Sequence, residues 1–129
     1  MNAKTRRLVR TRAGNCCEYC GLHQDQSPLS ALQIEHVIPK KHGGSDAVDN
    51  LALACIDCNL AKSSNIAGLD PQTSHMTELF HPRIHVWHEH FTRRGPYLHG
   101  TTPIGRTTMQ VLNMNSNEQI ELRSIHVGD

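Results

Sequence analysis

Two short segments, Cys17-Glu18-Tyr19-Cys20 and Cys55-Ile56-Asp57-Cys58, decide the fold of this chain. Each is a pair of cysteines separated by two residues, and residues 21–54 lie between the pairs. Two such pairs can place four thiolates tetrahedrally around Zn²⁺, with each sulfur about 2.3 Å from the ion. The spacing therefore predicts a structural zinc site with four ligands: Cys17, Cys20, Cys55 and Cys58. The long insert is expected to carry structure of its own.

The composition of the chain fits a metal-stabilised module. The 129 residues include five cysteines and ten histidines but only five aromatic residues, and positions 20–79 contain no aromatic residue. A chain of this length forms one domain, with room for a small appended unit. A structural zinc contributes roughly 10 kcal/mol or more of folding free energy in small modules, which would compensate for the thin apolar core.

The cysteines allow other interpretations. A redox dithiol or unrelated buried thiols would also use cysteine pairs, but two matched pairs favour zinc. The fifth cysteine, Cys16, could replace Cys17 as a ligand, although the two-residue spacing of the second pair favours Cys17. We expect Cys16 to be a small buried side chain.

Charge and hydropathy exclude several classes of protein. No apolar run approaches the roughly 18 residues of a membrane span, so we expect no membrane association. No apolar segment follows the basic start, so we expect no secretory signal and a cytoplasmic location. The formal net charge is only +1, but five basic residues crowd the first twelve positions, which suits either phosphate contact or a solvated helix face.

The first half of the chain predicts a mixed α and β module. Its expected elements are a basic helix at 5–13, strands at 32–38 and 51–54, and a helix at 57–66. Thr5 is the candidate N-cap of the first helix. The polar segment 40–50 contains Gly43-Gly44 and is expected to be a mobile loop.

The composition changes after Pro71, where four of the five aromatic residues and six of the ten histidines lie between positions 75 and 99. We place a boundary near residue 69, which divides the chain into units 1–68 and 69–129. The second unit is expected to contain a strand at 84–91, a helix at 102–113 with Pro103 in its first position, and a last helix or strand at 118–127.

The insert between the cysteine pairs carries residues suited to catalysis. Glu35 and His36 end the first expected strand, and a carboxylate beside an imidazole suits acid–base chemistry or metal binding. Successive side chains of a strand point to opposite faces of the sheet. Glu35 and His36 therefore point to opposite faces unless the strand bends before the following proline. Asn59 and Lys62 share a face of the next helix. Packing of that helix over the hairpin would bring His36, Glu35 and Asn59 together.

Together these residues resemble the HNH endonuclease family and its ββα-metal fold. The resemblance rests on Ile34-Glu35-His36-Val37-Ile38-Pro39, Gly43-Gly44, Asn50-Leu51 and Cys58-Asn59-Leu60-Ala61-Lys62, and it covers about residues 5–68. The three motif positions fall on His36, Asn50 and Asn59, which makes the chain an HNN variant. The implied fold is α+β, with an HNH nuclease module stapled by the four-cysteine zinc site and a small α/β C-terminal extension packed on it. That extension is similar to extensions of some bacterial members.

The resemblance implies hydrolysis of DNA phosphodiester bonds with a single divalent ion. His36 is expected to be the general base, because an imidazole with the reference pKa of about 6.5 is mostly neutral at pH 7. Glu35, Asn59 and the scissile phosphate are expected to hold the ion, and Asn50 to pin the loop that orients His36. Three lysines are candidate phosphate contacts: Lys40, Lys41 and Lys62.

The asparagine at position 59 affects the choice of metal. An amide oxygen and a carboxylate are hard donors, so we expect Mg²⁺ or Mn²⁺ in the active site and Zn²⁺ in the cysteine frame. The low net charge argues against strong non-specific binding, so a homodimer or a partner protein could supply specificity for DNA. The histidines of the extension have few acidic neighbours, and we expect them to pack around Trp87 and Phe91 or to contact the DNA backbone.

Two other functions stay open. A non-catalytic zinc-ribbon module that binds nucleic acid would need the cysteine pairs and the basic start, but it would not need Glu35, His36 and Asn59 together. A thiol–disulfide or zinc-handling protein would not need the Gly-Gly loop or Asn50-Leu51.

Overall fold

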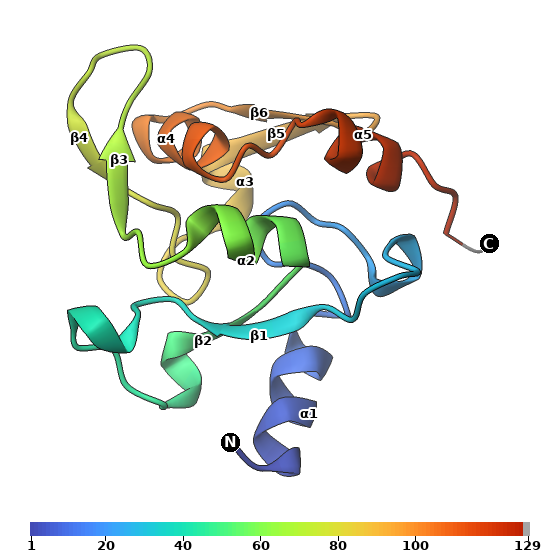
Figure 1. Cartoon of the computed structure of the whole chain (residues 1–129). Helices are drawn as coiled ribbons and strands as arrows, with labels where there is room; N and C mark the ends of the chain where they lie inside the picture. The colour runs from blue at the N-terminus through green and yellow to red at the C-terminus, as the bar shows by residue number, and fades with distance from the viewer. Residues whose placement is uncertain (128–129) are drawn as a thin grey trace.

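The computed structural model describes residues 1–127 and shows small two-stranded sheets among short helices (Figure 1). The elements are α1 (Ala3–Arg12), β1 (Gln33–His36), β2 (Leu51–Ala54), α2 (Ile56–Lys62), β3 (Ala67–Leu69), β4 (Met76–Glu78), α3 (Trp87–His90), β5 (Phe91–Arg94), β6 (Tyr97–Gly100), α4 (Pro103–Val111) and α5 (Asn117–Arg123). This mixture confirms the α+β class. No helix within residues 1–127 is long and apolar enough to cross a bilayer.

The hairpin of β1 and β2 is the centre of the first half. Its strands are antiparallel, with Gln33 opposite Ala54 and His36 opposite Leu51. All four residues of β2 are buried, because helices cover the hairpin on both sides. Figure 1 shows α2 on one side and α1 on the other, and both helices contact β1. The predicted succession of strand, strand and helix is confirmed.

Helix α1 begins earlier than expected. Thr5 is not its N-cap: the side chain of Asn2 accepts a hydrogen bond from the backbone N–H of Thr5 at 2.8 Å. Asparagine is a stronger N-cap than threonine, which explains the shift. Val9 anchors the helix in the core, and the guanidinium of Arg12 donates to the carbonyls of Val48 and Leu51.

The predicted strand at 84–91 is wrong. Trp87 to His90 form the short helix α3, and only Phe91 belongs to a strand. The indole N–H of Trp87 donates to the carbonyl of Tyr19 at 2.8 Å, and its ring stacks on Phe91. These tertiary contacts override the β-propensity of Ile84, whose side chain is left 72% exposed.

The two other elements predicted in the second half are present in the structure. The helix expected at 102–113 is α4, with Thr102 as N-cap and Pro103 in its first turn, and the last element is the helix α5. The hairpins β3–β4 and β5–β6 were not anticipated, because strands of three or four residues carry little periodicity. Strand β3 spans the boundary proposed near residue 69 and packs on α4 through Gly68, where a Cβ would lie 2.6 Å from the side chain of Val111.

Candidate functional site

The four cysteines of the two pairs form one buried cluster. Their sulfurs all lie within 4.8 Å of one another, and Sγ of Cys20 is 3.7 Å from Sγ of Cys55. Tetrahedral ligands 2.3 Å from zinc are about 3.8 Å apart, so the donors and their spacing fit a structural zinc. Hydrogen bonds from the neighbouring cysteines lower the pKa of Cys55, whereas burial raises the pKa of Cys17 and hydrogen bonds from the other cysteines raise that of Cys58.

The backbone shapes each cysteine pair as a turn around its first sulfur. The N–H of Cys20 points at Sγ of Cys17 at 3.5 Å, and the N–H of Cys58 points at Sγ of Cys55 at 3.4 Å. Cys16 is half-buried, and its sulfur faces the carbonyl of Gly14 outside the cluster. Cys17, and not Cys16, therefore belongs to the candidate metal centre.

His36 ends strand β1 with an imidazole that is 28% exposed. Its Nε2 lies 2.7 Å from Oδ1 of Asp46, and Nζ of Lys40 lies 3.2 Å from the same oxygen. Hydrogen bonds from His36 and Lys40 lower the pKa of Asp46. Sequence reasoning missed Asp46, although an acidic residue two positions after Gly43-Gly44 was an available signal.

Asn50 fastens the loop that carries Asp46. Its amide oxygen accepts from the N–H of Ile38 at 2.9 Å, and its amide nitrogen donates to the carbonyls of Ile38 and Ser45 at 2.9 and 2.8 Å. Gly44 leaves room for this arrangement, since a Cβ there would lie 1.7 Å from the carbonyl oxygen of Ile38. The 40–50 segment is thus tied down and contains short 3₁₀ turns at Lys40–His42 and Val48–Asn50.

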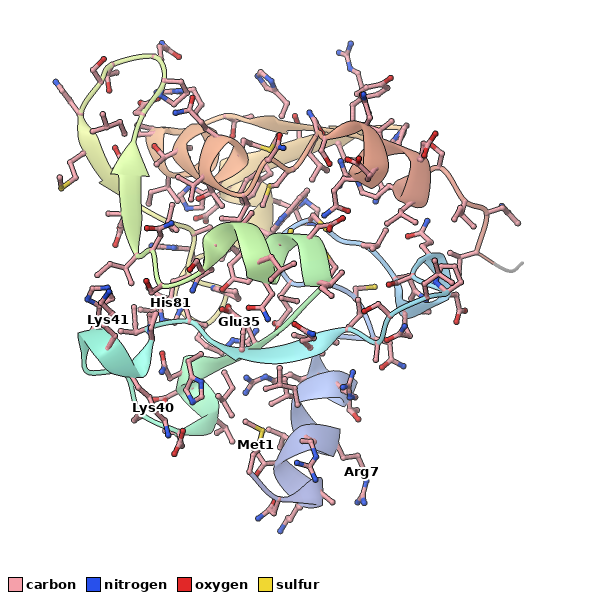
Figure 2. All side chains as sticks on the ribbon, in the orientation of Figure 1. Met1, Arg7, Glu35, Lys40, Lys41 and His81 are labelled. Carbon is pink, nitrogen blue, oxygen red and sulfur yellow. The ribbon has the colours of Figure 1, made fainter. Side chains whose placement is uncertain are left out.

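Glu35 points to the side of β1 that α2 covers, and Figure 2 shows it between these two elements. Oε2 accepts from Nζ of Lys62 at 3.1 Å, and Oε1 accepts a short hydrogen bond from the phenol of Tyr19. The ammonium of Lys62 also donates to the carbonyl of Val37 at 2.8 Å. Burial raises the pKa of Glu35, and the charge of Lys62 and the phenol of Tyr19 oppose that rise.

Asn59 lies on the same side of the hairpin as Glu35. Its Nδ2 donates to Oε1 of Gln33 at 2.6 Å, and Gln33 and Glu35 share a face of β1. The structure therefore gathers Glu35, Asn59 and Lys62 between β1 and α2, while His36 pairs with Asp46 in the loop.

The three candidate phosphate contacts lie in different environments. Lys40 and Lys41 are exposed at the 3₁₀ turn after β1, as Figure 2 shows, whereas the side chain of Lys62 is only 2% exposed. Lys62 is therefore turned inward, toward Glu35 and the carbonyl of Val37.

Glu35 and Asn59, the candidate ligands of a divalent ion, have to be compared with the four cysteines, the candidate ligands of zinc. Glu35 and Asn59 offer hard oxygen donors, which suit Mg²⁺ or Mn²⁺. Both oxygens of Glu35 already have partners, and one of these partners is the ammonium of Lys62. An ion at Glu35 would have to take the place of that ammonium.

Two histidines of the C-terminal half, His85 and His90, pack against Phe80, and His88 packs against Trp87. The ring of Phe80 lies 5.9 Å from that of His85 and 6.1 Å from that of His90. Nδ1 of His85 accepts from the backbone N–H of His81, and Nδ1 of His90 is 2.7 Å from the hydroxyl of Thr102. Within residues 1–127, the four cysteines are the only group of three or more metal-ligating side chains close enough to share an ion.

Comparison with protein families places this site in context. Residues 17–65 match the family model described as HNH endonuclease, and the matched segment contains both cysteine pairs, His36, Asn50 and Asn59. Residues 17–65 thus resemble an HNH endonuclease domain, which favours a nuclease acting on nucleic acid. Comparison with curated proteins and with solved structures gives no match.

Proposed function

We propose that this chain is a metal-dependent endonuclease that hydrolyses DNA phosphodiester bonds, with His36 as the general base. The observation that carries the proposal is the pairing of an accessible imidazole with a carboxylate, 2.7 Å apart, inside the HNH segment. When Nε2–H donates to Asp46, Nδ1 keeps its lone pair. That nitrogen then accepts the proton of the water that attacks phosphorus.

Asn50 and Asp46 serve as positioning residues for this step. Asn50 holds the carbonyl of Ser45, the residue before Asp46, and so fixes the carboxylate opposite the imidazole. The hydrogen bonds that lower the pKa of Asp46 keep it ionised at neutral pH, where it favours the Nε2–H tautomer of His36.

Mg²⁺ or Mn²⁺ is the proposed catalytic ion, with Glu35 and Asn59 as its protein ligands. Bound there, the ion would stabilise negative charge on the phosphate and on the leaving 3′ oxygen, so that cleavage yields a 5′-phosphate and a 3′-hydroxyl. Glu35 would be free to join the ligands only if the ammonium of Lys62 withdrew from its carboxylate.

The DNA backbone is proposed to follow the basic surface beside His36. Lys40 and Lys41 stand exposed just after β1, and no acidic residue precedes Glu18. Arg6 and Arg10 line an open groove of about 490 Å³ between α1 and residues 30–34. Ile34 in this groove shares a face of β1 with His36, so a strand in the groove leads toward the base.

A plasmid-nicking assay with Mg²⁺ tests the proposal. His36→Ala should lose at least about 100-fold in rate, because a general base contributes roughly 10²–10⁴-fold. His42→Ala, which changes an exposed histidine of the neighbouring 3₁₀ turn, is the matched control and should cut normally.

A His36→Ala protein that retains zinc and cuts like wild type contradicts the assignment. Binding of DNA without any nicking by the wild type would instead favour the non-catalytic zinc-ribbon module.

A further inference from the structure

A residue far outside the cysteine frame reaches its sulfurs. Gln119 lies in the C-terminal helix α5, beyond the segment that matches the family, and it is only 1% exposed. Its Nε2 is 3.2 Å from Sγ of Cys55, 3.8 Å from Sγ of Cys58 and 4.0 Å from Sγ of Cys20. The shortest of these is a hydrogen-bond distance to sulfur, so the amide faces three of the four candidate zinc ligands.

The orientation of the amide follows from the chemistry of its surroundings. The carbonyl oxygen of Gln119 is buried and has no hydrogen-bond partner within residues 1–127. The reversed amide would direct that oxygen at electron-rich sulfurs and remove an N–H donor from them. The observed orientation leaves the carbonyl of Gln119 unpaired, at a cost of about 1–3 kcal/mol, and directs the N–H at the cysteines.

Helix α5 is fastened so that this donor is held in position. The side chain of Gln26, from the first half, donates to the carbonyls of Arg123 and Ile125 at 3.2 and 2.8 Å. Arg123 is buried and donates to the carbonyls of Pro96 and Met114 at 2.8 and 2.6 Å. The C-terminal end of α5 is thus tied both to the first half and to the segments that precede the helix.

We infer that Gln119 is an outer hydrogen-bond donor to the zinc thiolates, so that α5 closes the metal centre and slows the release of zinc. Four thiolates around Zn²⁺ carry a net charge of −2, and the backbone N–H groups of Cys20 and Cys58 also point at these sulfurs. A side-chain N–H withdraws charge from the sulfur and makes it a poorer target for protons and alkylating agents.

The test compares variants of the full-length zinc-loaded protein. Gln119→Met keeps the length of the side chain but removes the donor, and Gln119→Glu places a carboxylate against the sulfurs. Glu121→Gln changes an exposed residue of the same helix and is the control. Transfer of zinc to a chromogenic chelator should be about ten-fold faster in Gln119→Met, faster still in Gln119→Glu and unchanged in the control.

A spectroscopic measurement separates hydrogen bonding from packing. In Co²⁺-substituted protein, loss of the N–H donor should move the sulfur-to-cobalt charge-transfer band of Gln119→Met to longer wavelength. If both variants release zinc at the wild-type rate and leave the band unchanged, even with a lower melting temperature, Gln119 only packs against the cluster. Wild-type protein without bound zinc also overturns the inference, whatever its nuclease activity.

Discussion

The ammonium of Lys62 lies 3.1 Å from the carboxylate of Glu35, and the two side chains are only 2% and 6% exposed. This buried pair joins α2 to β1, and Glu35 is the strand residue that directly precedes His36. The phenol of Tyr19 completes the group from between two cysteines of the metal cluster. The carboxylate of Glu35 therefore contacts both a residue of the first cysteine pair segment and a residue of α2.

Removing one partner of this pair should destabilise the fold. Lys62→Met leaves a buried carboxylate without its counter-charge, and we expect a loss of about 3 kcal/mol in the free energy of unfolding. Replacing both partners, as in Glu35→Gln with Lys62→Met, should recover most of that loss. Urea unfolding of the zinc-loaded proteins measures both values, and equal losses in the single and double variants would contradict the pairing.

The same single variant should respond to pH in a defined direction. Burial raises the pKa of Glu35, and without Lys62 this rise is less opposed. A group with a raised pKa in the folded state stabilises the protein at low pH and loses that contribution as the pH rises through the folded value. The deficit of Lys62→Met relative to wild type should thus be larger at pH 8 than at pH 5. A deficit that is constant over this range would be inconsistent with a buried Glu35 carboxyl.

Zinc content distinguishes the ligands from the spare cysteine. Elemental analysis should find about one zinc per chain in the wild type and in Cys16→Ser, since Cys16 lies outside the cluster. Cys58→Ser should lose zinc, unfold the module and abolish cleavage indirectly. Full zinc content in Cys58→Ser would show that the four sulfurs are not the ligands.

Much of the four-cysteine cluster and of the strand beside it could be predicted from the sequence, because both depend on local spacing. Two-residue gaps define the cysteine turns, and Leu51–Ala54 form the strand that their apolar run predicts. The orientation of Lys62 could not be predicted in the same way. Its burial depends on a carboxylate and carbonyls 25 to 27 positions away, and sequence alone favours an exposed lysine.

The residues that pack around the four-cysteine cluster were harder to predict. Gln119 is one polar side chain in a short helix, and nothing in its neighbours along the chain indicates that it meets sulfur. Likewise, Trp87 turns an expected strand into a helix through a contact with Tyr19, 68 positions earlier. Such pairings are set by packing between the two halves.

Acid stability should depend on Asp70 and Arg106, which join the start of the β3–β4 connection to α4. The guanidinium donates twice to the buried carboxylate, at 3.0 and 2.8 Å, and its hydrogen bonds lower the pKa of Asp70 to about 2. A lowered pKa means stability that is present above the ordinary value near 3.8 and is lost as the pH falls toward 2. Asp70→Asn should therefore unfold more easily than wild type at pH 6, and the two unfolding curves should converge near pH 2. A gap that persists at pH 2 would contradict this linkage.

The pairing of His36 with Asp46 makes a kinetic prediction. Asp46→Asn removes the charged acceptor of the imidazole N–H, so cleavage should slow by about ten-fold while DNA affinity changes little. Asp49→Asn removes the same charge from an exposed position of the same segment and is the control. Single-turnover nicking at saturating enzyme separates chemistry from binding. Equal rates for the two variants would show that Asp46 does not position the base.

The groove beside α1 predicts how binding of DNA depends on salt. Arg6 and Arg10 line it, whereas Lys4 and Arg7 do not, and Figure 2 shows Arg7 on the side of α1 opposite Met1, which also lines the groove. Each phosphate contact contributes about −0.9 to the slope of log affinity against log salt concentration. Arg6→Gln with Arg10→Gln should therefore flatten the slope by about 1.8. The matched variant Lys4→Gln with Arg7→Gln removes the same charge from outside the groove and should leave the slope nearly unchanged. Equal flattening in both variants would mean that the helix attracts DNA only through its total charge, and that the groove does not guide the strand toward His36.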